Sequence, residues 1–514
     1  MSLGRRTNLL RFAFRPAQDV ATTGVEQLPV TPGIAGSESI RRNAVFAFAV
    51  QVTSSAFTAA LTLFLVRALD PVGYGLFGLA AAIAALLSLP SDFGVSQSTA
   101  RFVAERRGDR VATARVIATG VRIKLWITGT VSILVFAVSG LIASAFGQPS
   151  LTWVLRGFAI AIFAESLMLL LMYAFVAQAR TSLNLRVAFV ESSVETAASI
   201  ALVLLGAGAV GAAFGRAIGY LTGFACAGLL ITRLLGRSVF ARPPPGEPGA
   251  GRIVRYGGAL FLVDSAYSLF NAIDVLVIGA FLTAADVGLF SAPMRLVGLV
   301  LLPATAISTA VSPRMADRLG TEREAGTYVR ALSYVVLFQV ALIPPLLVWA
   351  EPIVRLTLGS NYHGSVTVLR ALTPFAFLGG FGVLLSVTAN YLGQARRRVP
   401  IAISTVAINV VADLILIPRV GIVGGAIGTD LGYIVYAAGH FWVCQRILDT
   451  PLRPITASLL RASVAGVAMS GVLLAFGTHG LSLSTIVLGG FLAVIVYLAC
   501  VMALALPGRS DSVS

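Results

Sequence analysis

The chain is built from apolar runs of about 20 residues that recur along nearly its whole length, separated by short polar or basic segments. Each run, as a helix, is long enough to cross a hydrocarbon core about 30 Å thick. Only 12% of the residues are charged, against about 25% in soluble domains. The sequence therefore predicts an all-α polytopic membrane protein with about fourteen transmembrane helices.

The loops between the apolar runs alternate in charge. One set is rich in arginine, whereas the other has no basic residue or only isolated ones such as Arg67, Arg355 and Arg419. Basic loops stay on the cytoplasmic side, so we expect both termini to be cytoplasmic. This topology explains the net charge of +16 without a nucleic-acid partner. The basic loops include Arg106, Arg107, Arg180, Arg186, Arg233, Arg252, Arg323, Arg397, Arg446 and Arg453.

The chain contains an internal duplication. The corner LDPVGYGLF (69–77) returns as LTAADVGLF (282–290), with Gly75 matching Gly288 at an offset of 213 residues (288 − 75). VGAAFGRAIGY (210–220) matches VGGAIGTDLGY (423–433) at the same offset. The duplication covers six spans, so both copies start on the same face. We therefore predict two parallel six-helix repeats plus two extra C-terminal helices.

These patterns divide the chain into six parts. A basic cytoplasmic N-terminal tail is expected over residues 1–43, and it has no apolar core for a cleaved signal peptide. The other predicted parts are a first bundle at 44–235, a Pro/Gly linker at 236–256, a second bundle at 257–448, two additional helices at 449–506 and a cytoplasmic tail at 507–514.

Glycine is expected to act in two ways. In the repeated corner, we expect it to supply the backbone conformation of a tight turn between the first two helices of each half. In the GxxxGxxxG series that opens the sixth and twelfth spans, we expect it to let two helices approach closely.

Polar residues inside the spans are the candidate cavity residues. Gln51 and Thr58 in the first span correspond to Asp264 and Asn271 in the seventh. With 3.6 residues per turn, Asp264, Asn271 and Asp274 share one helix face. Charged groups in membrane helices are costly and face the bundle interior or water. The stripe either lines a transport cavity, with Asp264 and Asp274 as ion-coupling sites, or makes structural interhelical bonds.

Further polar residues lie in other spans. Arg295 in the eighth span either pairs with Asp274 or Asp264, or meets an anionic substrate. Asn409 and Asp413 form a stripe with Thr405 in the eleventh span. They complete the set of candidate cavity residues. Glu191 and Glu195 are expected to pair with Arg186 at the cytoplasmic edge.

Motifs that would indicate other functions do not occur in the sequence. Lys124 is the single lysine and does not close a phosphate-binding loop, and no HExxH or CxxC metal pattern is present. The predicted outward loops are short, whereas a membrane glycosyltransferase would need larger ones. The sequence thus disfavours an enzyme and predicts neither a cofactor nor a metal site.

Three stretches carry a family resemblance: RALDPVGYGLFGLA, DFGVSQSTARFVAE and GLFSAPMRLVGLVLLPATAISTAVSPRMA. They resemble bacterial polysaccharide-biosynthesis flippases of the O-antigen translocase type, within the multidrug/oligosaccharidyl-lipid/polysaccharide exporter superfamily. The resemblance implies two six-helix bundles, a central cationic cavity and alternating access. Among the candidate residues, only Arg295 carries over, by its place in the second-half motif.

The resemblance also implies a substrate and partners. The substrate would be a polyprenyl-diphosphate-linked oligosaccharide, such as a lipopolysaccharide or exopolysaccharide repeat unit, flipped across a bacterial cytoplasmic membrane. Membrane lipids and a polysaccharide polymerase with its export machinery would be the partners. Because the chain has no ATPase motif, we expect the energy to come from an ion gradient, from removal of the substrate outside or from a partner. The acidic residues inside the spans point to a proton or a sodium ion. The alternatives are a cation-coupled multidrug exporter and a non-transporting scaffold of a polysaccharide assembly complex.

Overall fold

The computed structural model describes residues 39–236, 250–301, 304–305, 307–308, 322–392 and 394–505. Most of the predicted N-terminal tail, the larger part of the linker and the C-terminal tail lie outside these ranges. Helix α8 begins at Ala250, inside the predicted linker. The described part of the chain is helical and contains no strand.

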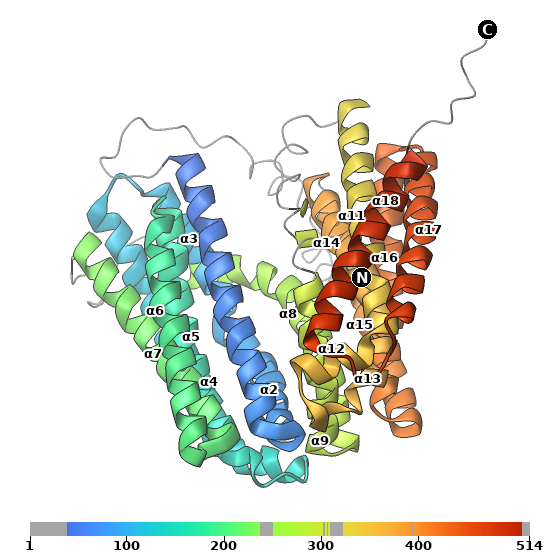
Figure 1. Cartoon of the computed structure of the whole chain (residues 1–514). Helices are drawn as coiled ribbons and strands as arrows, with labels where there is room; N and C mark the ends of the chain where they lie inside the picture. Colours follow the sequence, from blue (N-terminus) through green and yellow to red (C-terminus); the bar gives the residue numbers. More distant parts are fainter. Residues whose placement is uncertain are drawn as a thin grey trace, which may run out of the picture.

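The helices form two groups (Figure 1). The first group comprises α2 (Ile40–Asp92), α3 (Val95–Glu105), α4 (Arg110–Ala145), α5 (Leu151–Ala177), α6 (Thr181–Leu202) and α7 (Gly208–Leu235). The second comprises α8 (Ala250–Phe281), α9 (Ala284–Val300), α11 (Glu322–Val348), α12 (Ala350–Thr357), α13 (Ser365–Ala371), α14 (Thr373–Tyr391), α15 (Ala395–Val420) and α16 (Ile422–Leu448). The chain ends with α17 (Arg453–Ala475) and α18 (Leu483–Ala505).

The helices have the lengths that a polytopic membrane protein requires. Within the described residues, 10 helices are long and apolar enough to span a membrane. Two of them, Arg42–Asp92 and Thr181–Leu235, have 51 and 55 residues. Each contains a bend, at Asp70 and at Gly206, and is long enough for two spans. Helices α8 and α9 occupy the positions of the seventh and eighth predicted spans, so the predicted membrane fold is confirmed.

The repeated corner works differently from the prediction. Asp70, not a glycine, takes the left-handed backbone conformation at the first bend, with φ 55°, and its Oδ1 accepts a hydrogen bond from the amide of Gly73 at 2.9 Å. The prediction that glycine makes this turn was wrong. Asp can replace it because its short polar side chain bonds to the local backbone.

The corner glycines instead allow the two halves to touch. A Cβ added to Gly75 would lie well under 3.0 Å from the carbonyl oxygen of Ala284. A Cβ added to Gly288 would also lie well under 3.0 Å from the carbonyl oxygen of Pro71. Pro71 and Ala284 are separated by the same 213 residues as Gly75 and Gly288. The contact is therefore reciprocal, as expected where two parallel repeats meet about a shared axis.

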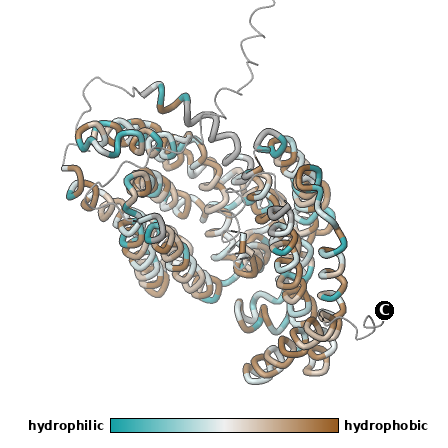
Figure 2. The backbone as a smooth tube through the Cα atoms, turned by 90° about the horizontal axis from the view of Figure 1, so that it is seen from above, coloured by the Kyte–Doolittle hydropathy of each residue, from teal (hydrophilic) through white to brown (hydrophobic). Residues whose placement is uncertain are grey.

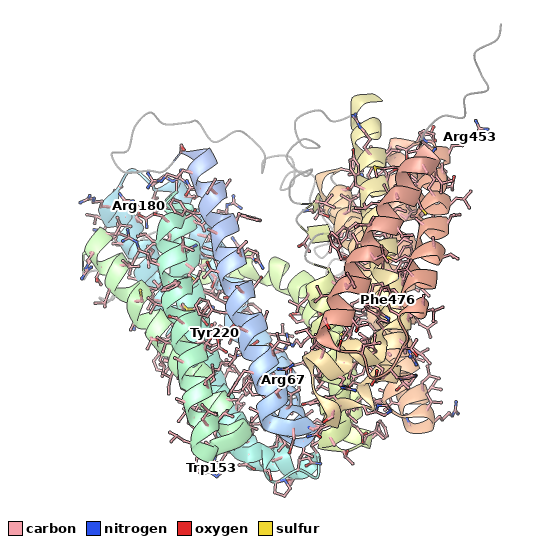
Figure 3. The ribbon with its side chains drawn as sticks, in the orientation of Figure 1. Arg67, Trp153, Arg180, Tyr220, Arg453 and Phe476 are labelled. Carbon is pink, nitrogen blue, oxygen red and sulfur yellow. The ribbon has the colours of Figure 1, made fainter. Side chains whose placement is uncertain are left out.

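Other bonds join the halves at this same end. Tyr362 Oη donates to the carbonyl oxygen of Asp70 at 2.9 Å. Arg67 Nε donates to the carbonyl oxygen of Thr357 at 3.2 Å, and its Nη2 donates to that of Leu356. Figure 3 shows Arg67 between the two groups. Toward the other end, where α2 begins, the groups diverge (Figure 1).

The last two helices are fastened to the second group through α11. Trp349 Nε1, just after α11, donates to the carbonyl oxygens of Leu473 and Gly477 at 3.1 and 3.0 Å. Tyr497 Oη in α18 donates to the carbonyl oxygen of Leu337 in α11 at 2.6 Å. Seen from above, the helices next to the C-terminus lie at the edge of the molecule and are coloured largely as hydrophobic (Figure 2).

Candidate functional site

A cavity of about 250 Å³ lies at the inner surface of the first group. Four helices of that group line it, and α9 of the second group contributes Arg295. Five of its lining residues are charged: Glu165, Glu191, Glu195, Arg216 and Arg295. Its polar lining also includes Ser54, Thr58, Thr62, Tyr74, Ser192, Thr196 and Tyr220. The lining thus mixes both signs of charge, and acidic residues outnumber arginines.

The pair Arg216–Glu195 is the best-defined contact in this cavity. Arg216 Nε donates to Glu195 Oε1 at 2.8 Å. The guanidinium carbon also lies 5.6 Å from the ring centroid of Phe77 and 5.7 Å from that of Phe158. A planar guanidinium can bond a carboxylate at its edge and contact aromatic rings with its faces. Arg216 is therefore held in place by three partners.

The glycine series in α7 brings this pair together. A Cβ on Gly219 would lie 2.5 Å from the Glu195 Cβ, and one on Gly215 would clash with the backbone of Ser199. Close approach of α6 and α7 was predicted and is confirmed. It places Glu195 against Arg216, so the predicted pairing of Glu191 and Glu195 with Arg186 is wrong. Glu191 instead accepts a hydrogen bond from Ser192 Oγ at 2.8 Å.

The second group reaches the same cavity through Arg295. This side chain is exposed and lies close to the buried hydroxyl of Tyr74, which also has Arg216 nearby. Thr58 lines the cavity too. Gln51 is one of the exposed residues of α2, donates to Ser55 Oγ at 3.2 Å and is not part of the cavity lining.

A second polar cluster lies between α8, α15 and α16. Asn409 Nδ2 donates to Asp274 Oδ1 at 2.8 Å and to Asp413 Oδ2 at 3.3 Å. Thr429 Oγ1 donates to Asp274 Oδ2, also at 2.8 Å. All four side chains are buried. The partners of Asp274 are Asn409, Thr429 and the neighbouring carboxyl group of Asp413, so Asp274 belongs to a different site from Arg295.

This cluster has free oxygen atoms. Asn409 Oδ1 and Asp413 Oδ1 are buried and accept no hydrogen bond from an N–H or hydroxyl group of the described residues. Gly428 leaves room for the latter, because a Cβ there would lie under 3.0 Å from it. No cationic side chain forms an ion pair with either carboxylate in the described part of the chain. Two carboxylates with amide and hydroxyl oxygens form a donor set that suits a hard cation or a shared proton.

The structure therefore separates the predicted residues into two places. Arg295 and Thr58 lie at the cavity, whereas Asp274, Asn409 and Asp413 come together in the second cluster. Asn271 is exposed on α8, and the side chain of Asp264 in that helix lies outside the described atoms.

Several polar residues of these sites were not anticipated, among them Arg216, Tyr220 and Thr429. Arg216 and Tyr220 line the cavity, and Thr429 completes the second cluster. All three lie within the matched glycine motifs of α7 and α16. The glycine motifs that predict close helix packing therefore also contain these polar site residues.

Comparison with known proteins identifies relatives in polysaccharide and glycan biosynthesis. The sequence profile of a family described as "Polysaccharide biosynthesis protein" matches residues 64–367, more than half of the chain. A protein of Haloferax volcanii named "Probable low-salt glycan biosynthesis flippase Agl15" is 23% identical over 279 residues. That alignment covers 53% of this chain and 58% of the relative. The chain thus matches little more than half the length of this curated relative.

Solved structures share the fold. The lipid II flippase MurJ in an inward closed conformation superposes with a TM-score of 0.72 at 15% identity, over 89% of this chain and 98% of MurJ. An inward-facing multidrug resistance transporter of the MATE family gives 0.64 at 17% identity, over 77% and 95%. At these identities, the likeness establishes the architecture alone. By its sequence match across both halves, the chain belongs to the polysaccharide biosynthesis protein family.

Proposed function

We propose that the protein is a flippase that moves a polyprenyl-diphosphate-linked oligosaccharide across the cytoplasmic membrane of a bacterium. The observation that carries this proposal is the charged cavity with arginines from both halves, Arg216 from α7 and Arg295 from α9. A substrate held between these two side chains would touch both groups of helices. Family membership in polysaccharide biosynthesis supports the same reading.

The chemistry of the cavity suits a phosphorylated glycan. A diphosphate with sugars cannot cross hydrocarbon without polar partners, and guanidinium groups bind phosphate oxygens through paired donors. Arg295 is exposed in the cavity, whereas Arg216 is already bonded to Glu195. We therefore assign the diphosphate to Arg295 first. The carboxylates and the hydroxyls of Tyr220 and Thr58 would accept or donate bonds to sugar hydroxyls.

The arrangement of the halves supports an inward-facing state. The groups are bonded together at the end that holds Arg67, and they diverge toward the other end (Figure 1). Arg180 and Arg453, both from the basic loops, lie at the diverging end, and Trp153 lies at the opposite end (Figure 3). By the positive-inside rule, we infer that the diverging end and both termini are cytoplasmic. A substrate would then enter from the cytoplasmic side.

We assign ion coupling to the Asp274–Asp413 cluster. Two buried carboxylates without a cationic partner are costly unless they bind a cation or share a proton. The free Oδ1 atoms of Asn409 and Asp413 supply ligands for such an ion. Since α8, α15 and α16 all contribute, ion binding would change how these helices pack. A gradient could thereby drive the exchange between states.

A second function has one observation in its favour. Glu165, Glu191 and Glu195 outnumber the arginines in the cavity, and carboxylates suit a cationic drug better than a diphosphate. A cation-coupled exporter of amphipathic cations is therefore the alternative. The third alternative is a non-transporting scaffold of a polysaccharide assembly complex, and this function would make no use of the cavity.

A deletion strain tests these functions. If the protein is the flippase, lipid-linked glycan should accumulate on the inner leaflet, and the wild-type gene should reverse this, whereas Arg295→Ala should not. Arg419→Ala is the matched control, since Arg419 is an exposed arginine that lines neither described cavity. Normal glycan export with increased drug sensitivity would support the exporter instead. Loss of export that Arg295→Ala restores fully would support the scaffold.

A further inference from the structure

A second cavity, of about 330 Å³, lies at the end where the halves are bonded together. Three parts of the chain meet there. Arg67 comes from α2 in the first group, Glu351 and Arg355 come from α12 in the second, and Ser482 and Leu483 come from the start of α18. None of these residues belongs to the cavity between the halves or to the Asp274 cluster.

The cavity presents positive charge from several directions. Arg355 is exposed and makes no ion pair or hydrogen bond with any described residue. Arg67 uses Nε and Nη2 for the carbonyl groups that end α12, and a guanidinium has five donors in all. The N-terminus of α18 adds the positive end of a helix dipole. Ser482 Oγ caps this end by accepting a hydrogen bond from the amide of Thr485 at 3.2 Å. Together these groups fit a phosphate.

One negative group sits beside them. Glu351 Oε2 is buried and accepts no hydrogen bond from a described residue, and the imidazole Nδ1 of His479 lies 3.8 Å from it. A buried carboxylate oxygen without a donor is costly. A primary ammonium group on the ligand would supply donors to it. The cavity therefore has complementary partners for both a phosphate and an ammonium group.

The outer surface of α18 indicates that the ligand carries acyl chains. Leu483 lines the cavity, and Val487 and Phe491 follow it at steps of one helical turn. These side chains are 61%, 63% and 66% exposed. An exposed apolar stripe on a membrane helix faces lipid tails. The stripe runs from the charged cavity along the helix, in the way that a lipid extends from its headgroup.

We propose that this cavity binds a membrane phospholipid whose headgroup contains both a phosphate and a primary ammonium group. Arg67 and Arg355 hold the phosphate, Glu351 accepts from the ammonium group, and the acyl chains lie along Leu483, Val487 and Phe491. A quaternary ammonium headgroup has no N–H donor for Glu351. The site therefore selects phosphatidylethanolamine over phosphatidylcholine.

The position of the site links it to conformation. Arg67 moves with the first group, whereas Arg355, Glu351 and Leu483 move with the second. A lipid that contacts both sets binds only while this end of the molecule is closed. By linkage, the lipid stabilises the closed arrangement by the difference between its binding free energies for the closed and the open arrangements.

Titration of short-chain lipids into the detergent-purified full-length protein tests the proposal, with the midpoint of the rise in thermal unfolding temperature as the readout. Phosphatidylethanolamine should bind at least about tenfold more tightly than phosphatidylcholine, since a charge-assisted hydrogen bond is worth that much. Glu351→Gln should remove this preference and leave both lipids bound. Arg355→Gln should weaken both about tenfold, whereas Arg419→Gln should match the wild type.

Soluble probes identify the source of the headgroup. Phosphoethanolamine and inorganic phosphate, added without lipid, should raise the unfolding temperature far less than the lipid does, because they lack the apolar stripe. Equal stabilisation by the soluble compounds would overturn the assignment to a lipid. Equal midpoints for the two lipids in the wild type, or an unchanged preference in Glu351→Gln, would overturn the assignment of the ammonium group.

Discussion

Arg216 and Thr429 occupy equivalent positions in the two repeats, 213 residues apart, and each donates a hydrogen bond to a carboxylate of its own half. Arg216 bonds to Glu195 at the cavity, and Thr429 bonds to Asp274 in the buried cluster, both at 2.8 Å. The duplication thus preserves the position of the donor and changes its chemistry. One half has a charged donor at the cavity, whereas the other has a neutral donor in an acidic cluster.

Removing Arg216 should destabilise the protein. Arg216→Leu leaves Glu195 without the cation that it bonds, and the expected loss in the free energy of unfolding is about 2 kcal/mol or more. Arg216→Leu combined with Glu195→Leu should recover much of it, because the charge left behind is gone. Thermal unfolding in detergent measures both. Additive losses in the double variant would contradict the pairing.

Closing the gap at the contact between the halves should drive them apart. Gly75→Ala and Gly288→Ala each place a methyl group against a backbone carbonyl of the other half. The expected result is a longer distance between spin labels at Val72 and Ala285, which are equivalent positions beside the contact. Gly298→Ala in α9 is the matched control, because nothing lies within 4 Å of its added Cβ. Unchanged distances in both corner variants would show that the contact does not hold this end closed.

Replacing Arg295 should affect transport and not folding. Arg295→Lys keeps the charge and loses the paired donors, so it should retain part of the activity. Arg295→Ala should abolish export while the unfolding temperature stays near that of the wild type, since the side chain is exposed. Complementation of the deletion strain, with membrane levels measured in parallel, reports both effects. Normal export by a stably expressed Arg295→Ala protein would exclude its role in binding.

The Asp274 cluster should make stability depend on the cation present. If the cluster binds sodium, the unfolding temperature should rise with sodium chloride and not with choline chloride. At a sodium concentration of 100 times Kd, the free energy of unfolding should increase by about 2.7 kcal/mol. Asp413→Asn should remove the response. Asp449→Asn is the control, because Asp449 is an exposed carboxylate at the end of α16 and bonds to none of the four cluster residues. An identical response in Asp413→Asn would place the ion elsewhere, and no response in the wild type would favour a proton.

Much of the fold followed from sequence patterns that do not depend on tertiary structure. Hydropathy fixes the spans, and the 213-residue offset fixes the repeat. The polar stripe of Asn409 and Asp413 was also visible, because residues at steps of four share a helix face. Their partnership with Asp274 was not, since it depends on which faces of α8, α15 and α16 meet.

The same limit explains the errors. Glu195 is nearer in sequence to Arg186 than to Arg216, yet the tight packing of α6 on α7 brings Arg216 within 2.8 Å. The corner glycines looked like turn residues because turns commonly contain glycine. Their actual neighbours, Ala284 and Pro71, belong to the opposite half and could be found only from the three-dimensional arrangement.

The attachment of α17 and α18 to α11 makes the duplicated halves mechanically unequal. The bonds from Trp349 and Tyr497 tie both helices to the second half. The second half, with α17 and α18 attached, is therefore the larger body in the bilayer. If the proposed alternating access operates, we expect the first half to move more than the second relative to the surrounding lipid, although the two halves share the 213-residue repeat.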